Sequence, residues 1–202
     1  MKRILVGFAL MGVLAIGAPS VASAQDEIIG VPDPAECTVE PRSLESFQAV
    51  LATPAAATPS ALPEMPDLPE GEPADEETEA AVLATLREAV ACINGGEIDR
   101  LLALYSDSAI VTLIGAGMGE FAEEIYDDIT TEEPPAEDAR TEIIEVQGVV
   151  VLPDGRVAAL VVGDDRADPD PASATLFIFV EQDGRWLIDA FIDTPDEGTP
   201  AP

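Results

Sequence analysis

The sequence predicts an α+β domain in which helices come first and an antiparallel sheet follows. Apolar residues recur at helical spacing over 75–110 and 120–130, whereas from residue 140 onward the period changes to two, as it does in strands. Pro153-Asp154-Gly155 and Asp183-Gly184 each separate two strand-like stretches, which is typical of β-hairpins. A run of helices followed by two hairpins favours the α+β class with an antiparallel meander.

Residues 75–96 are expected to form the first long helix. Acidic residues fill its first turn, where they suit the positive end of the helix dipole, and Asn94-Gly95-Gly96 is a typical helix end. Five apolar residues share one face of this helix: Val82, Leu83, Leu86, Val90 and Ile93.

Three shorter elements follow. Residues 97–110 are expected to form a second helix, residues 111–119 a short strand that runs into a glycine-rich turn, and residues 120–130 a third helix. The second helix carries an apolar face made of Ile98, Leu101, Leu102 and Tyr105.

Four strands make up the predicted sheet: 140–152, 156–165, 173–182 and 185–193. In the last strand, regular alternation places one set of side chains on an apolar face, namely Trp186, Ile188, Ala190 and Ile192. The other set is Leu187, Asp189, Phe191 and Asp193. Trp186, the only tryptophan, is therefore expected to be a core or pocket-wall residue that fixes the final hairpin, and a ligand-stacking role is the alternative.

The regions outside this domain have distinct compositions. Residues 25–52 form an N-terminal segment with a short helix over 43–51, which Ser43 can cap. Its apolar face, Leu44, Phe47, Val50 and Leu51, implies that it docks on another element. Residues 53–75 are a Pro/Ala-rich acidic linker whose prolines exclude regular helix or sheet. The folded domain therefore spans 76–193, and residues 194–202 are expected to be a disordered tail.

The first 24 residues have the features of a secretory signal peptide. Lys2 and Arg3 precede an apolar run that is too short to span a membrane well, and residues 22–24 read Ala-Ser-Ala, a good cleavage site. We expect cleavage after Ala24, a secreted or extracytoplasmic protein and no stable membrane insertion afterwards. An uncleaved membrane anchor is the alternative.

The charge of the chain excludes several functions. Residues 1–24 contain two basic residues and no acid, so their removal changes the net charge from −31 to −33. Such a polyanion repels nucleic acid, which is therefore not an expected partner. The acidity could also reflect a saline habitat, which the sequence does not separate from ordinary solubility.

The chain contains no histidine, which excludes Ser-His-Asp and Cys-His catalysis and His-ligated zinc sites. The acidic loop 163–171 lacks the glycine and the final glutamate of a calcium-binding EF-hand. We expect neither a metal nor a cofactor.

Cys37 and Cys92 are the only two cysteines. An even count in an exported chain favours a disulfide, which would hold the 43–51 helix against the end of the first long helix. Two unpaired buried thiols are the alternative.

Two stretches resemble the nuclear-transport-factor-2-like (NTF2-like) superfamily, which includes SnoaL-like and ketosteroid-isomerase-like proteins. "ACINGGEIDRLLALYSDSAIV" is similar to the family's opening helices, and "EQDGRWLIDAF" is similar to its final hairpin. The resemblance covers roughly 76–193. It implies a cone: a strongly curved antiparallel sheet wrapped around N-terminal helices, with a pocket between them.

The resemblance also bears on catalysis. The family's isomerases place a catalytic aspartate where this sequence has Leu113, and its dehydratases use a histidine that this chain lacks. Both departures argue against those reactions. Six residues remain as pocket candidates: Tyr105, Asp107, Leu113, Tyr126, Trp186 and Asp189. Asp107 could instead end the second helix, Asp189 could face solvent, and the two tyrosines could serve in packing.

Three function classes follow from these observations. The first is a non-catalytic module that binds an apolar small molecule or a protein partner. The second is a SnoaL-like small-molecule isomerase or cyclase with Asp189 or Asp107 as general base. The third is a purely structural interaction domain, and a homodimer is compatible with each class. An open interior favours the first two classes, and an interior filled with side chains favours the third.

Overall fold

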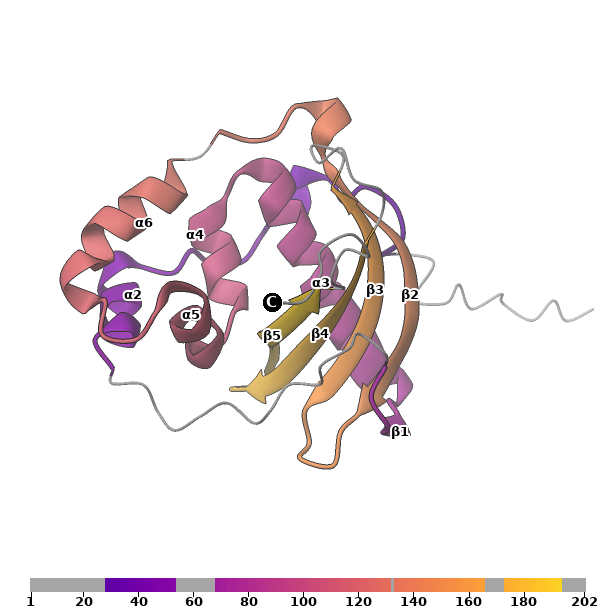
Figure 1. Cartoon of the computed structure of the whole chain (residues 1–202). Helices are drawn as coiled ribbons and strands as arrows, with labels where there is room; N and C mark the ends of the chain where they lie inside the picture. Colours follow the sequence, from indigo (N-terminus) through magenta and orange to yellow (C-terminus); the bar gives the residue numbers. More distant parts are fainter. Residues whose placement is uncertain (1–27, 54–67, 132, 166–172, 194–202) are drawn as a thin grey trace, which may run out of the picture.

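The structure of the protein is a computed structural model that describes residues 28–53, 68–131, 133–165 and 173–193. Within these ranges, a curved antiparallel sheet faces a group of helices (Figure 1). The strands lie in chain order: β1 (Glu72–Pro73), β2 (Thr141–Val151), β3 (Val157–Asp165), β4 (Ser173–Gln182) and β5 (Arg185–Asp193). The α-helices are α2 (Leu44–Leu51), α3 (Glu76–Gly95), α4 (Ile98–Leu101), α5 (Asp107–Ile114) and α6 (Ala122–Thr130). The predicted α+β class and the antiparallel meander are confirmed.

Several predictions concern residues that the structure does not describe. The signal peptide 1–24, most of the linker 53–75 and the tail 194–202 lie outside the described residues. The described end of the linker contains β1, whose Glu72 and Pro73 pair with Val151 and Val150 of β2. The expectation that prolines exclude any strand here is therefore wrong for this short stretch, because the edge of a sheet tolerates a residue without an N–H donor.

The hairpin turns lie where the Asp-Gly pairs predict them. Asp183 and Gly184 both have positive φ angles, 53° and 77°, as a type I′ turn between β4 and β5 requires. In the turn between β2 and β3, the Leu152 N–H donates to the Arg156 carbonyl at 2.8 Å, and Gly155 has a φ of 86°. These local signals set the register of both hairpins.

Irregular pairing curves the sheet. The β2–β3 ladder shifts register between Ile143 and Glu145 and again between Val146 and Val149. An extra residue in one strand bends that strand and increases its twist. As a result Ile143, Val146 and Val149 all join the core that α3 covers, although they are spaced by three residues rather than two.

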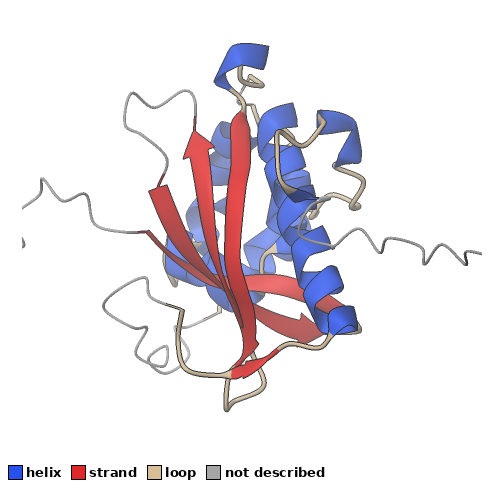
Figure 2. Ribbon diagram, turned by 90° about the vertical axis from the view of Figure 1, so that its right-hand side faces the viewer, coloured by secondary structure: helices blue, strands red, loops and turns tan. Residues whose placement is uncertain are grey.

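Helix α3 packs on the concave face of this sheet (Figure 2). It begins where the Asp75 carboxylate accepts the Thr78 N–H at 2.8 Å and ends at Gly96, whose φ is 66°. Its predicted apolar face is buried in one cluster with Val157, Phe179 and Ile188. The expected first helix is therefore confirmed, together with the acidic residues of its first turn and its end.

The helix predicted over 97–110 is broken. Helix α4 gives way to a 3₁₀ turn over Leu102–Leu104, and Tyr105 is extended. Ser106 then caps α5, because its hydroxyl accepts the Ala109 N–H at 3.1 Å. The strand predicted from residue 111 is wrong, since a short apolar run reads equally well as helix or strand and the Ser106 cap selects the helix. The predicted third helix is confirmed as α6, preceded by a 3₁₀ turn over Gly119–Phe121.

Helix α2 matches its predicted span and is capped by Ser43, but its dock differs from the expected one. Phe47, Val50 and Leu51 are buried in a second cluster with Leu102, Ile110 and Ala122. The Phe47 ring lies 5.4 Å from the Tyr126 ring of α6. The helix therefore packs on α5 and α6 rather than on α3.

The disulfide joins a different part of the N-terminal segment to α3. Cys37 and Cys92 are bonded, as predicted, and close a separation of 55 residues. Nearby, the Thr38 N–H donates to Glu88 Oε1 at 3.0 Å, and Glu36 forms an ion pair with Arg87. The hydrogen bond from Arg87 lowers the pKa of the Glu36 carboxyl. The bridge thus ties residues 34–39 to the last turns of α3.

Loss of the disulfide is expected to destabilise the domain without abolishing the fold. In the Cys37→Ser/Cys92→Ser double variant, the free energy of unfolding in urea should fall by about 4 kcal/mol at most, since strain and residual unfolded structure reduce the ideal loop-closure value. Thiol titration of the unfolded, unreduced parent should find no free thiol. Two reactive thiols in the parent would contradict the bridge.

Candidate functional site: a cavity between α3 and the sheet

A cavity of about 400 Å³ lies between α3 and the end of the sheet where β5 stops. This volume is in the range of small-molecule pockets, roughly 300–1,000 Å³. Helix α3 contributes Leu86, Ala89, Val90 and Ile93. The strands and Tyr105 supply the rest: Thr141, Glu142, Ile143, Val161, Gly163, Ser173, Thr175, Phe177, Ile188, Phe191 and Asp193. Two of these lining residues, Ala89 on α3 and Gly163 on β3, have small side chains.

An extra residue in β5 decides which side chains reach the cavity. Ile178 of β4 pairs with Ala190 and the next residue, Phe179, pairs with Ile188, so Asp189 is the additional residue on β5. Side-chain alternation therefore changes parity at Asp189, which means that odd- and even-numbered side chains exchange faces of the sheet after this residue. Phe191 and Asp193 line the cavity, whereas Ala190 and Ile192 pack with Leu176 and Ile178 on the opposite face of the sheet.

This bulge corrects the predicted faces of the last strand. Trp186 and Ile188 share the α3 side as expected, but Ala190 and Ile192 do not continue that face. Trp186 is half-buried against the core, and its carbonyl accepts the Thr85 hydroxyl of α3 at 3.0 Å. Its side chain is not part of the cavity wall. The backbone of Trp186 thus joins the start of β5 to α3.

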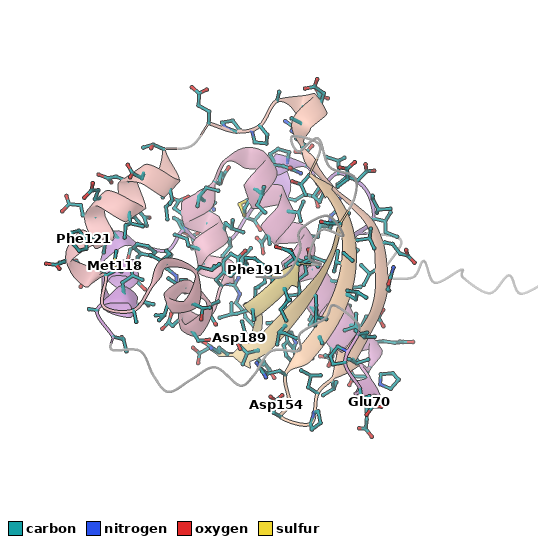
Figure 3. The ribbon with its side chains drawn as sticks, in the orientation of Figure 1. Glu70, Met118, Phe121, Asp154, Asp189 and Phe191 are labelled. Atoms are coloured by element: carbon teal, nitrogen blue, oxygen red, sulfur yellow. A yellow bond between two sulfur atoms is a disulfide. The ribbon has the colours of Figure 1, made fainter. Side chains whose placement is uncertain are left out.

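The Asp189 carboxylate holds the bulge to α5. One oxygen accepts the hydroxyls of Ser106 and Ser108 at 2.7 and 2.5 Å, and the other lies 3.4 Å from Arg156 Nη1. Arg156 donates a hydrogen bond to Asp154, and this bond, followed by the charge of Asp154 and the interaction with Asp189, raises the pKa of Arg156. Asp189 and Asp154 lie close together at the lower end of the sheet, and Phe191 lies higher, between the sheet and the helices (Figure 3). Asp189 therefore ties elements together and does not line the cavity.

Tyr105 is the predicted candidate that does line the cavity. Its backbone bridges Ile188 of β5, and its ring lies 6.4 Å from the Phe191 ring. Burial, and next the charge of Asp193, raises the pKa of Tyr105 to about 12. Its hydroxyl therefore stays protonated at neutral pH and remains a hydrogen-bond donor.

Arg42 holds the irregular segment between α4 and α5 that contains Tyr105. Its guanidinium donates to the Leu102 and Tyr105 carbonyls, both at 2.9 Å, and forms an ion pair with Asp107 at 2.8 Å. The Tyr126 hydroxyl donates to the Arg42 carbonyl at 2.6 Å. Burial, and then the charge of Asp99, raises the pKa of Tyr126. Sequence reasoning missed Arg42, whose one available signal is that it is a rare basic residue in an acidic chain.

The other predicted candidates lie away from the cavity. Asp107 is an exposed residue in the first turn of α5, after the Ser106 cap, and its partner is Arg42. Leu113 is half exposed on α5. Tyr126 packs on Phe47. Phe191 and Asp193 line the cavity without having been predicted, because the change of parity at Asp189 has no signature in the sequence. Phe177 of β4 also lines the cavity and was not predicted.

In the described part of the chain, no group of histidine, cysteine, aspartate or glutamate side chains could hold a metal ion. No helix in those ranges has the length and hydropathy to cross a membrane. Comparisons with protein-family models, with curated proteins and with solved structures find no match to this chain.

Replacement of Arg42 by lysine should destabilise the domain more than loss of its ion pair does. A lysine ammonium cannot reproduce the planar fork, so buried carbonyl groups lose their donors, at about 1–3 kcal/mol for each one left unpaired. Asp107→Asn removes only the ion pair, whose carboxylate is largely exposed, and should cost about 1 kcal/mol or less. Urea unfolding of both variants measures the difference. Equal losses would show that the carbonyl bonds contribute nothing beyond the ion pair.

Proposed function

We propose that this protein is an exported, non-catalytic binding module that holds a small apolar molecule in the cavity between α3 and the sheet. The observation that carries the proposal is the cavity itself, at about 400 Å³. Its wall is largely aliphatic and aromatic, with a few polar groups, which is the usual composition of a small-molecule site. Burial of a ligand's apolar surface against such a wall drives binding.

The proposal includes membership of the NTF2-like superfamily. Helices that precede a curved antiparallel meander, with a cavity between the two layers, are compatible with the family's cone. The phrases "ACINGGEIDRLLALYSDSAIV" and "EQDGRWLIDAF" fall on the helical segment from α3 to α5 and on the β4–β5 hairpin. These placements agree with the family order.

Export remains part of the same proposal. The Cys37–Cys92 bridge is compatible with an oxidising compartment, where disulfides persist. The signal-peptide features of residues 1–24 supply the route.

The other two function classes have less support. A general base must be within reach of the substrate, and the two carboxylates proposed for that role are engaged elsewhere: Asp189 with Ser106, Ser108 and Arg156, and Asp107 with Arg42. A purely structural domain would be expected to have a filled interior. The open volume beside Ala89 therefore favours the binding module.

Filling the cavity should abolish binding while the fold is kept. Ala89 is buried on α3 and lines the cavity, so Ala89→Leu places additional carbon atoms in that space. We expect unchanged or slightly higher stability without ligand, since cavity filling commonly adds about 0.5–2 kcal/mol. Affinity for 2-naphthylmethanol, measured by isothermal titration calorimetry, should fall at least about tenfold, the factor that 1.4 kcal/mol represents.

The matched control is Ala84→Leu, the same substitution at an exposed position of α3. It should leave both the melting temperature and the affinity for 2-naphthylmethanol close to those of the parent. If Ala89→Leu binds the alcohol as tightly as the control does, the cavity is not the binding site.

A further inference from the structure

Three aromatic rings form one side wall of the cavity. They come from β4, from β5 and from the irregular segment between α4 and α5. The Phe191 ring lies 6.4 Å from the Tyr105 ring and 6.3 Å from the Phe177 ring. All three residues line the cavity. A cation within about 6 Å of an aromatic ring centre is attracted by the negative face of that ring, most strongly where water is excluded.

Carboxylates lie at the same end of the sheet as this wall. Asp193, the last residue of β5, pairs with Thr175 of β4, and its carboxylate accepts the Thr175 hydroxyl at 2.7 Å. Glu142 lies at the start of β2 and also lines the cavity. The order of the strands places these two acids on either side of β3 and β4, so they flank the mouth of the cavity.

The two acids differ in exposure. Asp193 is exposed, and Glu142 is half-buried. A charged group of a ligand could therefore remain partly hydrated at the mouth while its apolar part enters the cavity. This arrangement avoids the large cost of burying an unpaired charge.

The cavity wall includes the carboxylates of Asp193 and Glu142. Among the described residues that line it, none is an arginine or a lysine. Arg140 lies directly before β2, at this end of the sheet, but it is not one of the lining residues. The net charge of −31 adds a long-range attraction for cations and a repulsion for anions.

We propose that the ligand is a cationic amphiphile: an apolar, preferably aromatic body that fills the cavity, joined to an ammonium group that lies between Asp193 and the rings of Phe191 and Tyr105. This inference rests on the proposed binding function and names its ligand class. A neutral ligand of the same shape gains the apolar contacts but not the attraction of the carboxylates and ring faces. An anionic one is repelled by Asp193.

Three naphthalene derivatives of nearly equal size test the proposal: 2-naphthylmethylammonium, 2-naphthylmethanol and 2-naphthoate. Isothermal titration calorimetry of the full mature protein is done at about 1 M sodium chloride, where the Debye length of about 3 Å screens distant charges. The ammonium should bind about tenfold more tightly than the alcohol, and the carboxylate most weakly.

Asp193→Asn should reduce the affinity for the ammonium about fivefold, as the loss of about 1 kcal/mol from an exposed ion pair does, and should leave the affinity for the alcohol unchanged. Phe191→Leu should weaken binding of both compounds, and of the ammonium more. The matched control is Glu70→Gln, which removes an exposed acid beside β1, well separated from Phe191 (Figure 3). It should leave the preference for the ammonium intact.

The outcomes separate this inference from the function on which it rests. If the alcohol or the carboxylate binds as tightly as the ammonium, the cationic ligand class is overturned and the binding module stands. An equal effect of Glu70→Gln and Asp193→Asn also overturns it, because the preference would then come from overall charge. If none of the three compounds binds, both the ligand class and the proposed function fail.

Discussion

The extra residue at Asp189 in β5 is the constraint on which the candidate site depends. Because Ala190 and Ile188 pair with consecutive residues of β4, the strand changes parity there, so that Ile188 and Phe191 both face α3. An unbulged strand would direct Ala190 and Ile192 at that face instead. Small aliphatic side chains would then replace the Phe191 ring and the Asp193 carboxylate at the wall. The bulge is stabilised by the hydroxyls of Ser106 and Ser108, which the Asp189 carboxylate accepts.

The same contacts link the bulge to the irregular segment between α4 and α5. The Ser106 N–H donates to the Ile188 carbonyl at 2.9 Å, and the Ser106 hydroxyl caps α5. Tyr105, which precedes the cap, is extended and joins the cavity wall. On the other side of this segment, Arg42 occupies the Leu102 and Tyr105 carbonyls. The two apolar clusters, one under α3 and one among α2, α5 and α6, therefore meet at a short irregular segment whose Leu102 and Tyr105 carbonyls are hydrogen-bonded to Arg42.

Features set by local chemistry could be predicted from the sequence. A type I′ turn requires positive φ at two positions, which an Asp-Gly pair tolerates, so Asp183-Gly184 predicts its turn. Gly96 ends α3 because glycine adopts positive φ at little cost. The apolar face of α3 and the cap of α2 follow from helical spacing and from Ser43. Tyr105 as a cavity residue followed from a family resemblance, not from a pattern in this chain alone.

Features set by distant contacts could not be predicted in this way. The bonds of Arg42 join residues about 60 positions apart, and those of Asp189 join residues more than 80 apart. Neither contact leaves a mark on local periodicity. The run Val111-Thr112-Leu113 is β-prone by composition, yet the Ser106 cap makes it helical. The parity change at Asp189 reassigns Phe191 and Asp193 to the cavity, and strict alternation, which is the rule available to sequence reasoning, assigns them to the other face.

The central claim is that the bulge at Asp189 directs Phe191 into the cavity. A nuclear Overhauser spectrum of the isotope-labelled protein tests it most directly, because it reports which protons lie within a few ångströms of one another. We expect cross-peaks from the Phe191 ring to both the Tyr105 and Phe177 rings, whose centres lie 6.4 and 6.3 Å away. Cross-peaks from the Ile192 methyl groups to the Tyr105 ring, with none from Phe191, would contradict the account, since β5 would then be a regular strand that presents its other face to α3.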